Sequence, residues 1–267
     1  MTGPIFERLA ILGAGLMGGS LALALRKTGA AGEIVLQDIS DGALKAARGR
    51  DAADIYETDP KAAMRNADCV CLAMPVGAFG AAIAAIAPHL AKGAVLTDLG
   101  SVKSVMDRAR HPALPGSAAL VPAHPIAGAA ESGIAAARSD LFEGARVVLT
   151  PEAETPAAAV ERIERLWRSL GAEPLRMTAA EHDRALAWTS HLPQAAASAL
   201  MAAIGAAAGD GGDLYRLAGP GLRDTTRLAG SEPSLWADIL LENRAEIAPA
   251  LAALGSTLER LAEALDS

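Results

Sequence analysis

Short apolar runs alternate with longer alanine- and leucine-rich stretches over the first two thirds of the chain. The apolar runs predict β-strands at residues 8–12, 33–37, 69–73, 94–97 and 119–122. The stretches between them have helical spacing, and this alternation is typical of a doubly wound parallel sheet with helices on both faces. Two further runs, at residues 146–150 and 173–177, predict more strands of the same sheet, with a helix between them that starts after Pro151.

The pattern changes at Thr178. Thr178 and Glu181 form a capping-box pattern, in which each residue satisfies a backbone N–H of the other at the start of a helix. Beyond it, apolar residues recur at helical spacing, and the glycine-rich segment 209–223 is the single interruption. The sequence therefore predicts an α/β domain at residues 1–177 and an all-α domain at residues 178–267.

Length, composition and charge exclude several classes of protein. A chain of 267 residues can bury a core in each of two domains. Aromatic residues make up only 3% of the chain and the formal net charge is −7, so the chain lacks the stacking platforms and the basic surface of a nucleic-acid binder. The most apolar expected helix, Leu192–Ala208, is too short to span a membrane. We expect neither nucleic acid nor membrane as a partner.

The two cysteines, Cys69 and Cys71, alternate with apolar residues in an expected strand, so both side chains point to one face. No second pair of ligands lies nearby in the sequence, and buried free thiols are therefore favoured over a metal site. Free thiols are typical of a reducing compartment, and the N-terminal residues lack the apolar core of a signal peptide. These features favour the cytoplasm.

Gly13, Gly15 and Gly18 form a G-x-G-x-x-G pattern that follows the first expected strand and opens a helix. The first glycine permits a tight turn, the second lets the backbone approach a pyrophosphate, and the third lets helix and strand pack closely. The N–H groups at the start of the helix then face the phosphates. The sequence predicts a Rossmann-type dinucleotide site that also includes Leu16 and Met17.

Asp38 ends the second expected strand, where a carboxylate can accept hydrogen bonds from both ribose hydroxyls. A carboxylate in this place repels the 2′-phosphate of NADP, so NAD is the expected cofactor. The alternative interpretation is that Asp38 caps the helix that begins near Asp41. Met74 and Pro75 follow the strand at residues 69–73 and are expected at the edge of the sheet where ligands bind.

Four short polar motifs lie among apolar residues, at expected strand ends and in the helical domain. They are Asp98-Leu-Gly-Ser101-Val-Lys103, His124-Pro-Ile-Ala-Gly128, Ser190-His191-Leu-Pro193 and Asp224-Thr-Thr-Arg227. In this order they resemble the motifs of the prephenate/arogenate (cyclohexadienyl) dehydrogenase family, and the resemblance extends from the glycine turn to Arg244. It implies NAD-dependent oxidation of prephenate or arogenate with loss of carbon dioxide, which yields 4-hydroxyphenylpyruvate or tyrosine.

The resemblance implies that His124 hydrogen-bonds the C4 hydroxyl of the substrate and that Ser101 assists it. A neutral imidazole suits the removal of a hydroxyl proton near neutral pH while hydride leaves for the nicotinamide. We expect Ser101 to contact the cofactor as well. The alternative interpretation is that His124 only orders its turn against Pro125.

The implied substrate carries two carboxylates, and a guanidinium can hold a carboxylate through two parallel hydrogen bonds. By resemblance Arg227 takes this part, while Arg223 and His191 line the substrate pocket. The alternatives are that Arg227 pairs with Asp224, three residues earlier, and that His191 is a core histidine.

The chain departs from the family pattern after Gly128. Many members carry a small hydroxyl residue and a carboxylate there, whereas this chain has Ala129 and Ala130, with Glu131 one place later. The choice between prephenate and arogenate therefore stays open. Lys103 is expected to hold the serine turn rather than to contact substrate. Three other histidines have no partner that suggests chemistry and are expected to be structural or exposed: His89, His111 and His182.

Two other functions are compatible with a Rossmann domain followed by helices. A β-hydroxyacid dehydrogenase generally relies on a lysine in its helical domain, and residues 178–267 contain none. A non-catalytic dinucleotide-binding sensor would need the glycine turn and Asp38 but not Ser101, His124 and Arg227 together. The alanine- and leucine-rich segments of the helical domain predict a homodimer, because a helix with apolar residues on several sides must be covered.

Overall fold

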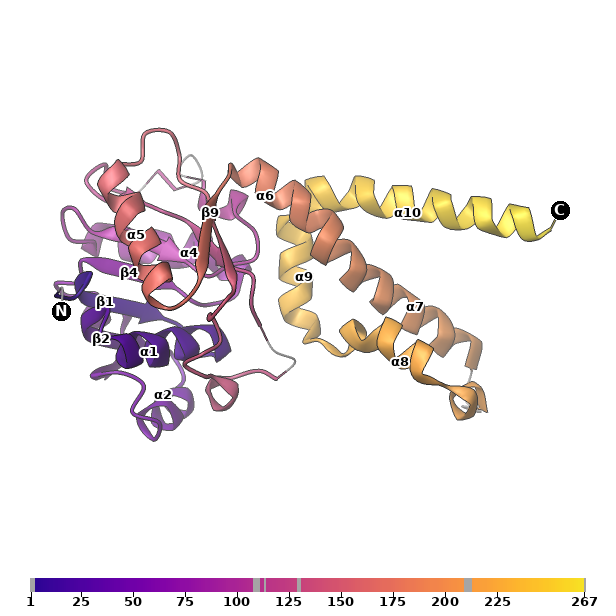
Figure 1. Cartoon of the computed structure of the whole chain (residues 1–267), viewed down its shortest axis with the longest axis horizontal. Helices are drawn as coiled ribbons and strands as arrows, with labels where there is room; N and C mark the ends of the chain where they lie inside the picture. Colours follow the sequence, from indigo (N-terminus) through magenta and orange to yellow (C-terminus); the bar gives the residue numbers. More distant parts are fainter. Residues whose placement is uncertain (1–2, 108–110, 113, 129–130, 209–212, 267) are drawn as a thin grey trace. The chain divides into compact units, whose positions relative to one another are not determined.

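The computed structural model describes residues 3–107, 111–112, 114–128, 131–208 and 213–266. The chain divides into two compact units, Met1–His182 and Asp183–Ser267. Figure 1 shows strands and helices in the first unit and helices in the second. The point of division falls inside helix α6, Ala179–Leu186, a few residues after the expected boundary.

A six-stranded parallel sheet forms the centre of the first unit, in the order β3-β2-β1-β4-β5-β6. Its strands are β1 Phe6–Leu12, β2 Ala31–Gln37, β3 Ile55–Glu57, β4 Cys69–Leu72, β5 Val95–Asp98 and β6 Ala119–Leu120. Most residues of β1 and β2 and all residues of β4 and β5 are buried, because helices cover both faces of a parallel sheet. The expected doubly wound fold is confirmed, and Cys69 and Cys71 are buried free thiols. The edge strand β3 was not expected, because three half-buried residues give no recognisable pattern.

The first unit has five α-helices in its described residues besides α6. They are α1 Leu16–Thr28, α2 Asp41–Arg48, α3 Pro60–Ala63, α4 Phe79–Ile86 and α5 Ala157–Ser169. Helix α5 begins later than the sequence suggests, because residues 152–155 form a turn in which the Thr155 hydroxyl donates to the Leu120 carbonyl at 3.1 Å. The indole of Trp167 on α5 packs edge-on against Phe142 in the core, with ring centroids 5.2 Å apart.

The remaining strands of the first unit form a separate sheet, in the order β7-β8-β9. They are β7 Ala123–Pro125, β8 Arg146–Leu149 and β9 Glu173–Arg176. The expectation that residues 146–150 and 173–177 extend the first sheet is therefore wrong. Pro122 has no N–H to continue the hydrogen-bond ladder of β6, and the chain leaves the first sheet there. Strand β7 then pairs antiparallel with β8, and β8 pairs parallel with β9.

The second unit contains the helices α7 Leu192–Ala208, α8 Pro220–Thr226, α9 Pro233–Glu242 and α10 Arg244–Leu265, and a π-helical turn at Ala187–His191 precedes them. The capping box at the start of α6 is confirmed: the Thr178 N–H donates to the Glu181 carboxylate at 2.8 Å, and the Glu181 N–H donates to the Thr178 hydroxyl at 3.2 Å. None of the helices in the described residues has both the length and the apolar character needed to cross a membrane.

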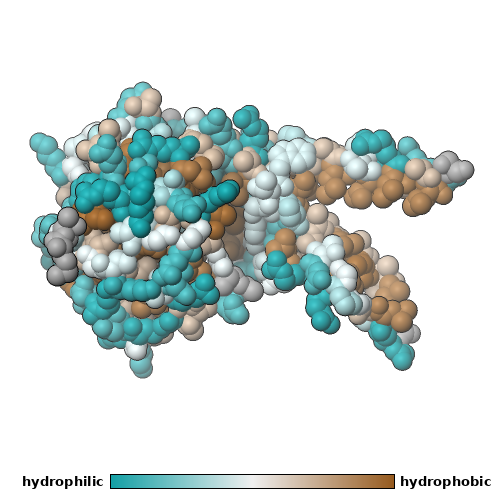
Figure 2. Space-filling model, viewed as in Figure 1, coloured by the Kyte–Doolittle hydropathy of each residue, from teal (hydrophilic) through white to brown (hydrophobic). Residues whose placement is uncertain are grey.

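Leucines are exposed along one side of α10. Leu251, Leu258, Leu261 and Leu265 have exposed fractions of 40%, 55%, 58% and 81%. Together with the half-buried Leu254 they repeat at intervals of three and four residues, which is the spacing of a helix–helix seam. Figure 2 shows hydrophobic surface running along α10 on its side towards α7.

Candidate active site

The turn after β1 has no room for side chains at two of its three glycines. Gly13 has a φ of 117°, which other residues rarely adopt, and a Cβ on it would lie 2.4 Å from the Ala73 carbonyl oxygen. A Cβ on Gly18 would lie 1.9 Å from the Gly13 carbonyl oxygen. A Cβ on Gly15 would meet nothing within 4 Å, and Gly15 provides no side-chain cap for α1. The open side of the turn at the start of α1 therefore fits a phosphate group.

Asp38 follows β2 and binds the glycine turn directly. Its Oδ2 accepts a hydrogen bond from the Ala14 N–H at 2.7 Å, and its Oδ1 accepts one from the Ser40 N–H at 2.9 Å. The interpretation of Asp38 as a helix cap is wrong, because the Ser40 hydroxyl caps α2 by accepting from the Ala43 N–H. Asp38 instead holds the glycine turn at the end of β2.

The residues expected to bind the cofactor gather where the strand order changes direction. Strand β1 has β2 on one side and β4 on the other, and the turns after all three strands lie at the carboxyl edge of the sheet. Met74 and Pro75 follow β4, while Leu16 and Met17 lie half-buried in the first turn of α1. Ligands of open α/β sheets bind at such a switch point.

Ser101 lies in the turn after β5, which is fixed by a buried ion pair. The Lys103 ammonium contacts the Asp98 carboxylate, and both side chains have an exposed fraction of 0%. Lys103 also donates to the Ala123 carbonyl at 2.8 Å, while Asp98 accepts from the N–H groups of Ala123 at 3.1 Å and Gly100 at 2.8 Å. Burial raises the pKa of Asp98, and the charge of Lys103 opposes this. The expectation that Lys103 holds the serine turn is confirmed.

His124 follows Ala123 directly, so the ion pair fixes the backbone from which His124 extends. It lies opposite Val148 of β8 and is 9% exposed. Its Nδ1 is 2.8 Å from Nε2 of His182, and the two rings meet at 69° with centroids 5.1 Å apart. The candidate site therefore contains a pair of hydrogen-bonded histidines.

His182 was not expected in the site. It is completely buried in the first turn of α6 and contacts His124, so the expectation that it lacks a partner is wrong. The capping box could have indicated that His182 is buried, because it fixes where α6 starts and hence which residues share a face of this helix. His182 and Asp183 lie at helical spacing from Leu186 and Ala187, and polar residues on such an apolar face need buried partners.

The expected substrate-binding residues belong to the second unit. His191 is completely buried at the end of the π-helical turn, with its Nδ1 2.9 Å from the side-chain nitrogen of Asn243 and its ring edge-on to Trp236. Arg223 and Arg227 are exposed, on α8 and directly after it. In the described part of the chain Arg227 forms no ion pair with Asp224.

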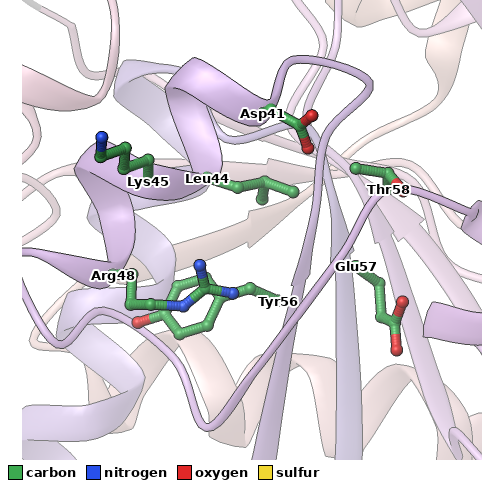
Figure 3. A pocket seen from close by; sticks show the side chains of 7 residues that line it. All are labelled: Asp41, Leu44, Lys45, Arg48, Tyr56, Glu57 and Thr58. Atoms are coloured by element: carbon green, nitrogen blue, oxygen red, sulfur yellow. The ribbon is translucent and has the colours of Figure 1, made fainter.

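Two other parts of the chain add no ligand contact to the candidate site. Ala129 and Ala130 lie outside the described residues, and Glu131 is exposed. A surface hollow of about 520 Å³ lies between α2 and the end of β3 (Figure 3). Its lining residues are Asp41, Leu44, Lys45, Arg48, Tyr56, Glu57 and Thr58. None of the expected site residues lines this hollow, and its two acids offset its two bases, so it favours no ligand class.

Models of two protein domains match the chain. The nucleotide-binding domain of prephenate dehydrogenases matches residues 21–175, and their dimerization domain matches residues 178–267. A cyclohexadienyl dehydrogenase of Zymomonas mobilis is 37% identical over 264 residues, which cover 98% of this chain and 90% of the relative.

Solved structures of similar proteins cover almost the whole chain. A prephenate dehydrogenase from Aquifex aeolicus in complex with hydroxyphenyl propionate and NAD⁺ has a TM-score of 0.89 and 32% identity, covering 97% of this chain and 90% of the other. An arogenate dehydrogenase from Synechocystis has a TM-score of 0.80 and 29% identity, covering 97% and 92%.

Proposed function

The chain belongs to the prephenate dehydrogenase family, and on this premise we propose that His124 is the general base of its reaction. The observation that carries the proposal is the hydrogen bond between His124 Nδ1 and His182 Nε2. If His124 donates in this bond, its Nε2 holds the lone pair that a general base needs.

The chain is an NAD-dependent dehydrogenase that carries out oxidative decarboxylation in tyrosine biosynthesis. When bound at the glycine turn, NAD would supply the acceptor for the hydride from C4 of the substrate ring. His124 takes the C4 hydroxyl proton at Nε2, and Ser101 supports this hydroxyl with a hydrogen bond. Loss of the ring carboxylate as carbon dioxide follows, because it produces an aromatic ring.

We propose that the glycine turn and its neighbours bind the cofactor. The N–H groups at the start of α1 receive the pyrophosphate, and the absence of a side chain at Gly15 lets it approach. Asp38 accepts hydrogen bonds from the ribose hydroxyls, which favours NAD over NADP. The remaining contacts come from Gly13, Leu16, Met17, Gly18, Met74, Pro75 and Ser101.

We propose that the second unit supplies the groups that bind the substrate. Arg227 is exposed and can hold a carboxylate through two parallel hydrogen bonds. Arg223, one helical turn earlier, provides a second cation. His191 lines the pocket with its ring oriented by Asn243. The keto acid prephenate and the amino acid arogenate share the ring and its carboxylate, and both are proposed substrates.

We further propose a homodimer that works in the cytoplasm, with a dinucleotide-binding domain at residues 1–177 and a substrate and dimerisation domain at residues 178–267. The exposed leucines of α10 support the homodimer, because a seam of this spacing is buried against another helix. The two free cysteines support a reducing compartment.

Spectrophotometric measurement of NADH formation tests the function. We expect NADH from NAD with prephenate, arogenate or both, together with 4-hydroxyphenylpyruvate or tyrosine, and much less turnover with NADP. A β-hydroxy acid series serves as the comparison, because oxidation of these acids instead of the ring substrates would indicate a β-hydroxyacid dehydrogenase. NAD binding without oxidation of any of these compounds would indicate a sensor and contradict the proposal.

A further inference from the structure

We propose that His182 is a positioning residue that keeps Nε2 of His124 unprotonated by accepting the proton of its Nδ1. The inference rests on the proposed role of His124 as general base. It concerns which ring nitrogen of His124 carries the proton before the reaction begins.

The contact permits only two arrangements of protons. A neutral imidazole has one nitrogen that donates and one that accepts, so in the 2.8 Å contact one histidine must donate to the other. If His182 donates, Nδ1 of the neutral His124 accepts and its Nε2 carries the proton. His124 could then not take a proton from a hydroxyl. If His124 donates, its Nε2 has the lone pair, and only this arrangement suits a general base.

The sheet β7-β8-β9 positions both histidines, one on its strand β7 and the other on the helix that follows β9. His124 lies on β7, and β8 connects β7 to β9. The Met177 N–H donates to the Leu149 carbonyl at 3.1 Å and so fixes the chain that leads from β9 into α6. The His182 N–H then donates to the Thr178 carbonyl at 3.0 Å within the capped first turn.

The arrangement also fixes the plane of the His124 ring. The edge-on contact at 69° lets the His182 ring restrict rotation of His124 about its side-chain bonds. Both residues are almost completely buried, so little water competes for Nδ1. During the reaction the hydroxyl proton goes to Nε2 of His124, while the proton on Nδ1 stays in its bond to His182. His182 therefore acts through His124 and takes up no proton itself.

Two substitutions of His182 separate the hydrogen bond from packing. His182→Phe keeps a ring but cannot accept a proton, whereas His182→Gln keeps an acceptor. We expect His182→Phe to lower kcat by at least about tenfold, within the roughly 10²–10⁴-fold that a general base contributes, with KM and the Kd of NAD nearly unchanged. His182→Gln should recover most of this loss. An unchanged kcat in His182→Phe, or an equal loss in both variants, would overturn the proposal.

His111→Phe is the matched control. His111 is also buried in the first unit, and its Nε2 lies 2.7 Å from the Val105 carbonyl. Its replacement removes a comparable imidazole contact, and we expect kcat to stay within about twofold of the original. A loss of kcat as large as that of His182→Phe would mean that any buried histidine has this effect, and would overturn the proposal.

Nitrogen-15 NMR of the unsubstituted protein provides a test that does not depend on turnover. The ring signals of His124 are identified by their loss in His124→Asn. We expect a protonated Nδ1 and an unprotonated Nε2 in the neutral ring, and the reverse would overturn the proposal. If the protein oxidised neither ring substrate, the proposed function would fail, while the NMR result would still report the protons of the pair.

Discussion

The Lys103 ammonium is bound to the Asp98 carboxylate inside the protein, and together they hold both backbone polar groups of Ala123. We predict that Lys103→Met destabilises the fold by about 3–5 kcal/mol, because it leaves a buried carboxylate without its counter-charge. Urea unfolding measures this, with the Asp98→Asn/Lys103→Met double variant as control. The double variant should lose less stability than Lys103→Met alone, and an equal or larger loss would contradict the role of the charge.

The stability of Lys103→Met should also depend on pH. Burial raises the pKa of Asp98, and without Lys103 the main opposing charge is gone. A carboxyl whose pKa is raised on folding destabilises the folded state most at high pH, where it is charged. This destabilisation falls as the pH drops and the carboxyl takes up a proton. The stability difference between the unsubstituted protein and Lys103→Met should therefore shrink in acid. Urea midpoints at several pH values measure it, and a difference that widened in acid would refute this explanation.

Replacement of His124 by asparagine tests the proposed general base. Asparagine is similar in size but cannot take up a proton near neutral pH, so we predict a loss of turnover of about 10²–10⁴-fold. The Kd of NAD should remain nearly unchanged, because the cofactor is proposed to bind through the glycine turn. Steady-state kinetics and a binding titration measure the two quantities. Full activity in His124→Asn would remove this residue from the mechanism.

Two glycines in one turn should respond differently to alanine. A Cβ on Gly18 meets a backbone carbonyl at 1.9 Å, and Gly18→Ala should destabilise the fold by at least about 1–3 kcal/mol even without cofactor. A Cβ on Gly15 meets nothing, so Gly15→Ala should fold with normal stability and bind NAD more weakly. Thermal unfolding with and without NAD distinguishes the two. Normal NAD affinity in Gly15→Ala would argue against close approach of the pyrophosphate.

The leucine seam of α10 should control the oligomeric state. Leu258→Glu places a charge in the seam, and we predict that it shifts the homodimer towards monomer, because each buried leucine contributes roughly 1.5–3 kcal/mol. Ala253→Glu, on an exposed position outside the seam, is the control and should leave the dimer intact. Light scattering over a range of concentrations measures the mass. A monomer in the unsubstituted protein at working concentration would contradict the proposal.

Glu164 on α5 should stabilise the fold at neutral pH and lose this contribution in acid. The hydrogen bond from Arg176 is the largest influence on Glu164 and holds its pKa below the ordinary 4.5, and Arg168 adds a second contact at 3.0 Å. A carboxyl with a lowered pKa stabilises the fold above its unfolded pKa, and this stabilisation is lost as the pH falls through the folded pKa. Glu164→Gln should be less stable than the original protein at neutral pH, with the difference vanishing below the folded pKa. Denaturant midpoints at several pH values check this.

The sequence predicted those parts of the fold that depend on local patterns. Uninterrupted apolar runs identified β1, β2, β4 and β5, and the Thr178–Glu181 spacing identified the start of α6. The second sheet could not be predicted, because pairing of β7 with β8 depends on contacts between residues about 25 positions apart. A run such as residues 146–149 has the same pattern in either sheet.

The sequence also predicted those parts of the candidate site that depend on local patterns. The glycine turn and Asp38 have a fixed spacing, so their proximity follows from a local pattern. The contact between His124 and His182 joins residues 58 positions apart, and no spacing in the sequence indicates it. Likewise, the Lys103 motif suggested a structural role, but its hydrogen bond to the Ala123 carbonyl depends on where β7 lies.

Asp38 binds the glycine turn and is proposed to bind the cofactor ribose as well, which limits how this enzyme can be redesigned for biocatalysis with NADP. The usual change replaces such an aspartate with a smaller neutral residue to admit the extra phosphate. Here that change would also remove the acceptor of the Ala14 N–H at 2.7 Å, so the glycine turn proposed to hold the pyrophosphate would loosen. A successful redesign must therefore restore an acceptor for that N–H from elsewhere while it adds a cation for the phosphate.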